Sequence, residues 1–310
     1  MTRHERRPFG RSGLGVIAIG LPALMFLLLS LGTPDFLTAR NIANVNSQIT
    51  ALLIVALGQL VVALIGGIDI SVGSIVSLTS VVLASLSASV AVPVALALAA
   101  LVGFGNGLGV AVFGVHPLIM TLATMTFVQG FALLVMSAAG GTVPPLLITL
   151  AKTSIAGLPA GFFWCILALA IVAVLLYRTA FGLRLFAIGA NAQSAALSGV
   201  GVGAPRITCY MLCSLAGAIA GVYLTGRIAS GDPTMGAPFG LNSVTAIALG
   251  GVQLSGGVGS VIGVALGTLT LGLIANGMNL VGISPFFSAA LTGLLLLGAV
   301  SLQRRKAIGI

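Results

Sequence analysis

Long apolar stretches recur along the whole chain and are separated by short polar links. Most approach the ~20 residues that an α-helix needs to cross the ~30 Å hydrocarbon core of a bilayer. The first ends near Leu31, and the others cover approximately residues 47–65, 69–90, 93–113, 117–137, 161–177, 207–226, 243–251, 260–277 and 285–302. The weakly hydrophobic segment 138–160 is predicted to be an outer loop with a short interfacial helix. The pattern predicts an all-α, polytopic membrane helix bundle with about ten transmembrane helices.

Four arginines precede the first apolar stretch: Arg3, Arg6, Arg7 and Arg11. A cleaved signal peptide would also begin in this way. The stretch is about eighteen residues long, however, and no clear small-x-small cleavage site follows it. We therefore expect a retained first span, and we expect residues 1–310 to form a single transmembrane domain.

The interior segment 178–206 is the one long link that is basic, free of acidic residues and too polar to lie in lipid. With ten spans, it faces the same side of the membrane as both chain ends. That side then holds ten of the thirteen basic residues: Arg3, Arg6, Arg7, Arg11, Arg178, Arg184, Arg206, Arg304, Arg305 and Lys306. Basic residues collect on the cytoplasmic side of membrane proteins. The charge pattern therefore predicts that both termini are cytoplasmic.

The composition excludes several classes of protein. Hydrophobic residues make up 58% of the chain and charged residues 5%, against about 25% charged residues in soluble domains. The formal charge of +9 does not indicate nucleic-acid binding, because the basic residues sit at the edges of apolar stretches and form no patch.

No constellation of residues suggests catalysis. The three cysteines lie in apolar stretches without a neighbouring His or carboxylate, so we expect small buried side chains and no metal site. The segment GGVQLSGGVGS lacks the Gly-Lys-Ser/Thr ending of a phosphate loop. Only four acidic residues are present, too few near membrane depth for a proton or sodium relay. We expect no enzyme and no bound cofactor, and we expect the energy source to lie in another subunit.

Glycine is abundant, with 43 residues, and part of it is spaced to form small helix faces. Such faces let helices approach closely in lipid, where no hydrophobic force drives them together. The spaced glycines are Gly103 and Gly107, Gly105 and Gly109, Gly217 and Gly221, and the series Gly259, Gly263 and Gly267.

Two other glycine pairs interrupt apolar stretches in a related way. Gly66-Gly67 is followed by Ile-Asp-Ile-Ser, and Gly250-Gly251 is followed by Val-Gln-Leu-Ser, so both match GG-x-x-x-S. A repeated interruption of this kind points to a transporter with broken helices. The predicted helix breaks comprise Gly66, Gly67, Asp69, Ser71, Gly250, Gly251 and Gln253. Asp69 has two possible roles: a cap for the third span, with Ser71 and Ser74 in its first turn, or contact with solute and gating.

Several segments resemble the ribose-type family of sugar ABC transporter permeases, which are bacterial inner-membrane importer subunits. The segments are GGIDISVGSIVSL at 66–78, HPLIMTLATMTFVQG at 116–130, RTAFGLRLFAIGANAQSAALSGVGV at 178–202 and the C-terminal part at 245–300. The resemblance covers nearly the whole chain. It implies a multi-pass permease of the inner membrane that translocates a monosaccharide delivered by a periplasmic binding protein.

The resemblance also implies partners and a coupling loop. Two permease subunits, identical or different, would assemble with two ATPase subunits that bind ATP and with the solute-binding protein. The central loop, 178–206, would dock into the ATPase subunit through a short helix around Asn191 to Gly199, with Gly182 and Gly189 shaping its approach. The coupling residues so implied are Gly182, Arg184, Gly189, Asn191, Ala195, Ala196 and Gly199. The alternative is a solvated basic loop held by lipid phosphates.

Polar residues isolated in apolar stretches are candidates for the translocation path: Gln59, Asn106, Thr121, Thr124, Gln129, Asn276 and Asn279. Each could instead form an interhelical hydrogen bond. Two positions depart from the family pattern. Gly240 and Asn242 stand where the family usually has an acidic pair, expected at the outer face, and Gln253 replaces a small hydroxyl residue. The identity of the solute therefore stays open. The alternatives are a permease for a branched-chain amino acid or nucleoside, and a stand-alone secondary transporter or channel.

Overall fold

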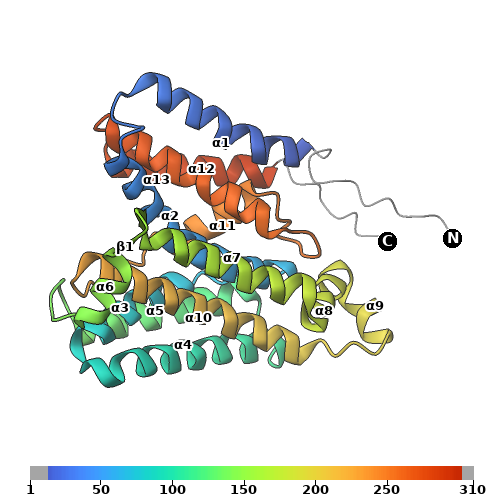
Figure 1. Cartoon of the computed structure of the whole chain (residues 1–310). Helices are drawn as coiled ribbons and strands as arrows, with labels where there is room; N and C mark the ends of the chain where they lie inside the picture. The colour runs from blue at the N-terminus through green and yellow to red at the C-terminus, as the bar shows by residue number, and fades with distance from the viewer. Residues whose placement is uncertain (1–12, 302–310) are drawn as a thin grey trace.

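Helices account for nearly all of residues 13–301, the part of the chain that the computed structural model describes (Figure 1). Two very short strands form the only sheet in these residues. The elements are α1 (Gly13–Gly32), α2 (Ala39–Leu64), α3 (Val72–Ser85), α4 (Ala88–Ala111), α5 (Pro117–Val135), α6 (Pro145–Lys152), β1 (Ser154–Ile155), β2 (Leu158–Pro159), α7 (Ala160–Arg178), α8 (Ala180–Ala190), α9 (Ala192–Leu197), α10 (Gly203–Ile228), α11 (Phe239–Leu249), α12 (Val261–Leu280) and α13 (Pro285–Ser301).

The predicted all-α membrane helix bundle is confirmed. Six helices of the described residues are long and apolar enough to cross a membrane: α2, α4, α5, α7, α10 and α12. The remaining predicted spans coincide with the apolar helices α1, α3, α11 and α13. Of these, α3 has 14 residues and α11 has 11. At ~1.5 Å per residue each covers only part of the bilayer core.

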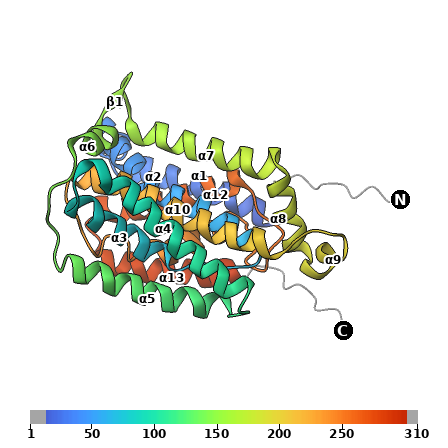
Figure 2. The same cartoon turned by 90° about the horizontal axis from the view of Figure 1, so that it is seen from below.

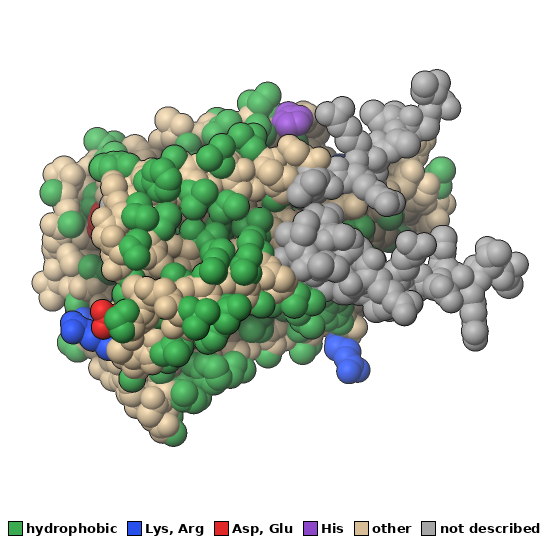
Figure 3. Space-filling view, turned by 90° about the horizontal axis from the view of Figure 1, so that it is seen from above, with side chains coloured by type: hydrophobic (Ala, Val, Ile, Leu, Met, Phe, Trp, Pro, Cys, Tyr) green, Lys and Arg blue, Asp and Glu red, His purple; other side chains and the backbone are tan. Residues whose placement is uncertain are grey.

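α2 lies at the centre of the bundle and the helices around it face lipid. Every residue of α2 from Thr50 to Leu64 is buried. By contrast, α4, α5 and α7 expose large apolar side chains such as Phe104, Phe127 and Ile171. In Figure 3 hydrophobic side chains spread over the middle of the visible face, and the charged side chains that can be seen lie toward its ends. This is the distribution of a helix bundle that displays an apolar belt to lipid.

Glycine faces bring α10 against its neighbours. A Cβ at Gly103 would lie 2.6 Å from the Met211 Cα, and one at Gly107 would lie 2.6 Å from the Ile207 Cα, so α4 packs on α10 through bare backbone. On another face of α10, a Cβ at Gly221 would lie 2.8 Å from the Thr79 Cβ of α3. These contacts follow the predicted small-residue spacing, because close backbone approach replaces the missing hydrophobic drive in lipid.

The two ends of the bundle carry different connections. Figures 1 and 2 place α8 and α9 at one end, which we call the α8 end, and α6 with the strands at the other, the α6 end. The described part of α1 begins, and that of α13 finishes, at the α8 end (Figure 1). The predicted basic clusters at residues 3–11 and 304–306 lie outside the described residues.

Segment 138–160 holds the short helix α6, as expected, and a hairpin that the sequence analysis did not predict. β1 pairs antiparallel with β2 through a two-residue turn in which Ala156 has φ 51° and Gly157 has φ 80°. Two-residue hairpin turns of this hand need positive φ at both positions. Ala156 is a poor signal for such a turn, since Asn, Asp or Gly usually occupies it.

The link between α10 and α11 runs along α3 and is partly buried. The backbone N–H of Asp232 donates to Ser80 Oγ at 3.0 Å, and that of Gly236 donates to Ser77 Oγ at 3.0 Å. Non-helical backbone at membrane depth needs such partners, because no water is available there. Ser77 and Ser80 are three residues apart on α3, and both are fully buried.

Candidate functional site: the helix breaks and the glycine junction

The first break ends α2 in a left-handed glycine cap. Gly66 has φ +77°, its N–H donates to Ala63 O at 2.9 Å, and the N–H of Gly67 donates to Val62 O at 3.1 Å. These two bonds define a Schellman motif, which satisfies the last helical carbonyls and turns the chain away. Gly66 is required here, because a side chain is disfavoured at positive φ.

The second break ends α11 with the same motif. Gly251 has φ +77°, its N–H donates to Ala248 O at 3.1 Å, and the N–H of Val252 donates to Ile247 O at 3.0 Å. Gly66 therefore corresponds to Gly251. The GG-x-x-x-S alignment, which pairs Gly66 with Gly250, is displaced by one residue. Two adjacent glycines give no sign of which one adopts the left-handed conformation, and this ambiguity explains the displacement.

The two breaks meet each other and α8 at one point. The N–H of Gly257 donates to Leu64 O at 2.9 Å, which joins the loop after α11 to the end of α2. A Cβ at Gly256 would lie 2.9 Å from the Gly66 N and 3.2 Å from the Gly189 Cα. We call residues 64–66, 189–190 and 255–257 the glycine junction.

Gly189 brings α8 into the glycine junction. A Cβ at this position would overlap the carbonyl oxygen of Leu64 and the backbone nitrogen of Gly257. Gly189 has an ordinary helical conformation, so its need for glycine comes from close approach and not from φ. α8 is therefore packed directly against the end of α2 and against the loop after α11.

The central loop contains two helices where the sequence analysis expected one. The Thr179 side chain accepts from the N–H of Gly182 at 3.3 Å at the start of α8, and Asn191 Oδ1 accepts from the N–H of Ser194 at 2.9 Å at the start of α9. Gly182 and Gly189 are buried within α8, the helix that leads into α9. The physical reason is the Thr179 cap, which starts a helix before the expected one.

α9 projects from the α8 end (Figure 2). It ends at Leu197, and the chain then turns at Gly199, whose φ is +81° and whose N–H donates to Ala196 O at 3.0 Å. Ala195 is buried and Ala196 is exposed. Leu197 is 84% exposed, an apolar side chain on a projecting helix, and the sequence analysis did not select it. Arg184 on α8 is also exposed.

Asp69 anchors the polypeptide between α2 and α3. Its Oδ1 accepts from the N–H of Ser71 at 2.9 Å and from Ser71 Oγ at 2.6 Å, and the residue is fully buried. The amide of Gln59, oriented by its hydrogen bonds, donates to Asp69 O at 3.0 Å and accepts from Asp69 N–H at 3.1 Å. The carboxylate therefore caps the start of α3 while α2 holds its backbone.

Three other candidate path residues belong to this same network. Asn106 Nδ2 of α4 donates to Ser71 Oγ at 2.8 Å, and Thr124 Oγ1 of α5 donates to Asn106 Oδ1 at 2.6 Å. Thr121 Oγ1 lies 3.4 Å from Ile68 O. Asn106 and Thr121 are fully buried, whereas Thr124 is half-buried. The structure thus links α4 and α5 to the first break through polar side chains.

The remaining candidate path residues lie elsewhere. Gln129 is half-buried and its Nε2 donates to Pro233 O at 2.7 Å. Asn276 exchanges hydrogen bonds with Asn41, at 2.8 and 3.0 Å, inside the packing of α12 on α2. Asn279 is exposed. Gln253 holds the loop after α11, since its N–H donates to Val258 O at 2.9 Å.

Gly240 does not lie at an exposed outer face, which corrects the expectation for this position. It is buried at the start of α11, where a Cβ would lie 2.8 Å from Ile70 O at the start of α3. Asn242, two residues further along α11, is half-buried. The error follows from the inward path of segment 229–238 along α3, which no local pattern indicated.

Within residues 13–301, no group of three or more His, Cys, Asp or Glu side chains is arranged to hold a metal ion. The polar atoms of the two breaks are backbone groups, hydroxyls, amides and one carboxylate.

Comparison with known proteins places the chain in a family. The model of the family described as branched-chain amino acid transport system / permease component matches residues 41–300. The ribose import permease protein RbsC of Bacillus subtilis is 36% identical over 91% of this chain and 90% of its own length. The L-arabinose transport system permease protein AraH of Escherichia coli is 36% identical over 92% and 88%. No solved structure gives a significant match. The chain therefore belongs to the family of transport-system permease components that includes these ribose and L-arabinose permeases.

Proposed function

We propose that this chain is the membrane-spanning permease subunit of an ATP-driven importer of a monosaccharide. The observation that carries the proposal is the glycine junction, where the central loop meets both helix breaks. The relatives are permeases for ribose and L-arabinose, which favours a simple sugar. The family description names branched-chain amino acids, so these form the second candidate class of solute.

The proposed orientation has ten spans and puts the α8 end in the cytoplasm, with the membrane being a bacterial inner membrane. Arg178 and Arg184 lie at this end, as does the start of the described part of α1 (Figure 1). Basic residues favour the cytoplasmic side. The single domain would comprise the whole of residues 1–310.

Coupling to ATP hydrolysis would begin at α9. The exposed Leu197 side chain offers an apolar contact to a cleft in the ATPase subunit, and apolar anchors in pockets dominate the energy of such interfaces. Because only Asn191 separates α8 from α9, displacement of α9 would move Gly189 and therefore both helix breaks. A pair of ATPase subunits, a second permease subunit and a periplasmic binding protein would complete the importer.

The translocation path is proposed to run between two permease subunits. Thr124, Gln129 and Asn279 remain accessible in this conformation, so these three would line it. Gln59, Asn106, Thr121 and Asn276 are buried and hydrogen-bonded. They would form the wall behind the path and keep the breaks in register.

The experiment is ATP-dependent uptake in proteoliposomes. The permease, co-purified from its own membranes with its ATPase subunit, is reconstituted with its binding protein and given labelled ribose, arabinose or leucine. Uptake of a pentose that needs ATP supports the proposal. Uptake of leucine in preference to both sugars would reassign the solute, and uptake by the permease alone without ATP would refute an ATP-driven importer.

A further inference from the structure

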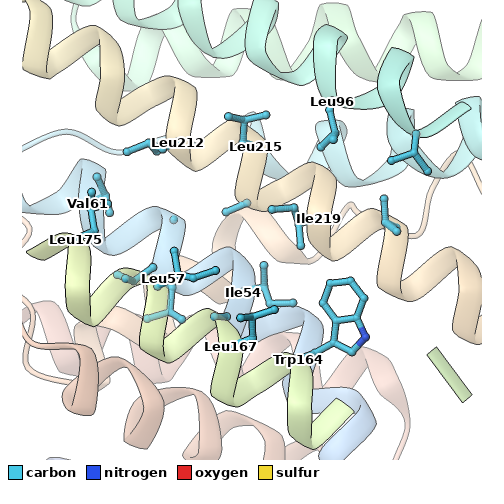
Figure 4. Close-up of a pocket in the computed structure, with 17 residues that line it drawn as sticks. Ile54, Leu57, Val61, Leu96, Trp164, Leu167, Leu175, Leu212, Leu215 and Ile219 are labelled. Carbon is cyan, nitrogen blue, oxygen red and sulfur yellow. The ribbon is translucent and has the colours of Figure 1, made fainter. Parts of the chain in front are cut away.

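An apolar groove of about 420 Å³ opens on the side of the bundle between α7 and α10 (Figure 4). Seventeen residues of α2, α4, α7 and α10 line it, and all of them are Gly, Ala, Val, Leu, Ile or Trp. Its floor is the close contact between Gly58 and Ala216, where a Cβ at Gly58 would lie 2.7 Å from the Ala216 Cβ. A sugar could not bind here, because its hydroxyls would find no hydrogen-bonding partner.

The groove runs along the membrane normal for about one leaflet. On α7 it extends from Leu175, near the α8 end, to Trp164, near the α6 end, as Figure 4 shows. These eleven helical steps cover roughly 16 Å, close to half of the ~30 Å bilayer core. The indole N–H of Trp164 donates to Leu150 O at 3.1 Å, so the ring closes the groove as an apolar wall.

Polar groups stand one helical turn beyond the groove at the α8 end. Arg178 follows Leu175 by three residues on the same face of α7 and is exposed. Thr208 precedes Leu212 by four residues on α10 and is also exposed. The basic residues Arg184 and Arg206 belong to the same connecting segment, which contains no carboxylate. The mouth of the groove is therefore cationic.

We propose that the groove holds one acyl chain of an anionic phospholipid from the leaflet at the α8 end, with its phosphate at Arg178. An acyl chain gains little from leaving bulk lipid, which is equally apolar. Selectivity must come from the headgroup, and arginine binds phosphate through several parallel hydrogen bonds.

A helix from a second copy of the chain fits the groove less well. Close helix packing in membranes uses small residues at the contact. The rim here is formed by large side chains, including Leu167, Ile171 and Leu215, with the small residues recessed at the floor. A thin, flexible acyl chain can enter such a slot, whereas a helix of ~10 Å diameter cannot.

Trp164 is the only tryptophan of the chain and reports on the groove directly. The full-length permease is reconstituted in phosphatidylcholine vesicles that contain one brominated lipid. In one sample this lipid is phosphatidylglycerol and in the other it is phosphatidylcholine, each brominated near the end of the acyl chain and present at the same mole fraction. Bromine quenches indole fluorescence on contact. We expect brominated phosphatidylglycerol to be enriched at the groove roughly fivefold over phosphatidylcholine, the preference supplied by one arginine at an anionic surface.

Matched variants separate the groove from bulk lipid. Val172→Phe fills the groove midway along α7, and Val174→Phe adds the same ring where the side chain is 56% exposed. The first should abolish the excess quenching and the second should keep it. Arg178→Gln should reduce the excess, whereas Lys152→Gln at the α6 end should not.

Three results would overturn the proposal. Equal quenching by the two lipids in the wild type would remove the headgroup selectivity. Excess quenching that survives Val172→Phe would place the lipid outside the groove. Protection of Trp164 from both lipids would mean that protein, such as a second copy of the chain, fills it.

Discussion

Replacing Gly189 by alanine tests the glycine junction at its tightest point. The added methyl group would overlap the Leu64 carbonyl oxygen and the Gly257 backbone nitrogen. These are the acceptor and donor atoms of the hydrogen bond that joins the end of α2 to the loop after α11. Both are backbone atoms, so no side chain can rotate away, and the junction must open.

The magnitude follows from two terms. Inserting a methyl group into a well-packed site costs about 1–3 kcal/mol, and losing the Gly257 to Leu64 hydrogen bond costs about 0.5–1.5 kcal/mol. The packed junction therefore loses about 1.5–4.5 kcal/mol. Since ~1.4 kcal/mol is a factor of ten, its population relative to an opened junction falls about tenfold or more.

The assay measures uptake and ATP hydrolysis together in proteoliposomes, with thermal unfolding of the purified permease alongside. Gly189→Ala should lower the number of solute molecules carried per ATP and the unfolding midpoint. Gly201→Ala is the matched control, because Gly201 lies in the same connecting segment with nothing within 4 Å of its Cβ position and no positive φ. If Gly189→Ala and Gly201→Ala both keep the wild-type ratio and midpoint, the junction does not couple α8 to the breaks.

Other substitutions probe the buried polar groups. Asp69→Ala leaves the N–H and hydroxyl of Ser71 without their acceptor and should lower the free energy of unfolding by about 1–3 kcal/mol. Asp69→Asn keeps one acceptor oxygen and should lower it by less. A changed solute preference with normal stability would assign Asp69 to solute contact instead. A double-mutant cycle on Asn41→Ala and Asn276→Ala, the pair that joins α2 to α12, should give a coupling energy of about 0.6–1.7 kcal/mol, and additive losses would disprove the pairing. Gly161→Ala places a methyl group 2.5 Å from Asn46 Oδ1 and 2.6 Å from Thr50 Oγ1, so it should lower the free energy of unfolding by about 1–3 kcal/mol. Gly130→Ala, which adds a methyl group in open space, should be tolerated. Equal thermal unfolding midpoints of the two variants would contradict this packing.

Membrane insertion and the position of the helices were predictable from the sequence. Apolar stretches of span length mark membrane helices because every backbone polar group must be satisfied inside lipid. The glycine spacing of α4 and α10 was informative as well, because helices that approach each other closely in lipid carry small residues at regular intervals along one face. A capping role was one of the two roles predicted for Asp69, because a carboxylate and serines at a helix start act over only a few positions, and its hydrogen bonds with Ser71 agree with that role.

The convergence of distant segments was decided only by the tertiary structure. Gly66, Gly189 and Gly257 are far apart in the sequence, and nothing local indicates that a Cβ on one would strike the backbone of another. For the same reason the burial of Gln59 and Asn106 was open, since an isolated polar residue suits a solute path and an interhelical bond equally well. The contacts of segment 229–238 with Ser77 and Ser80 were hidden as well, because these serines lie on a different helix. Local periodicity determines which residues form a helix and which face is small, whereas the partner of each face depends on how all the helices pack together at once.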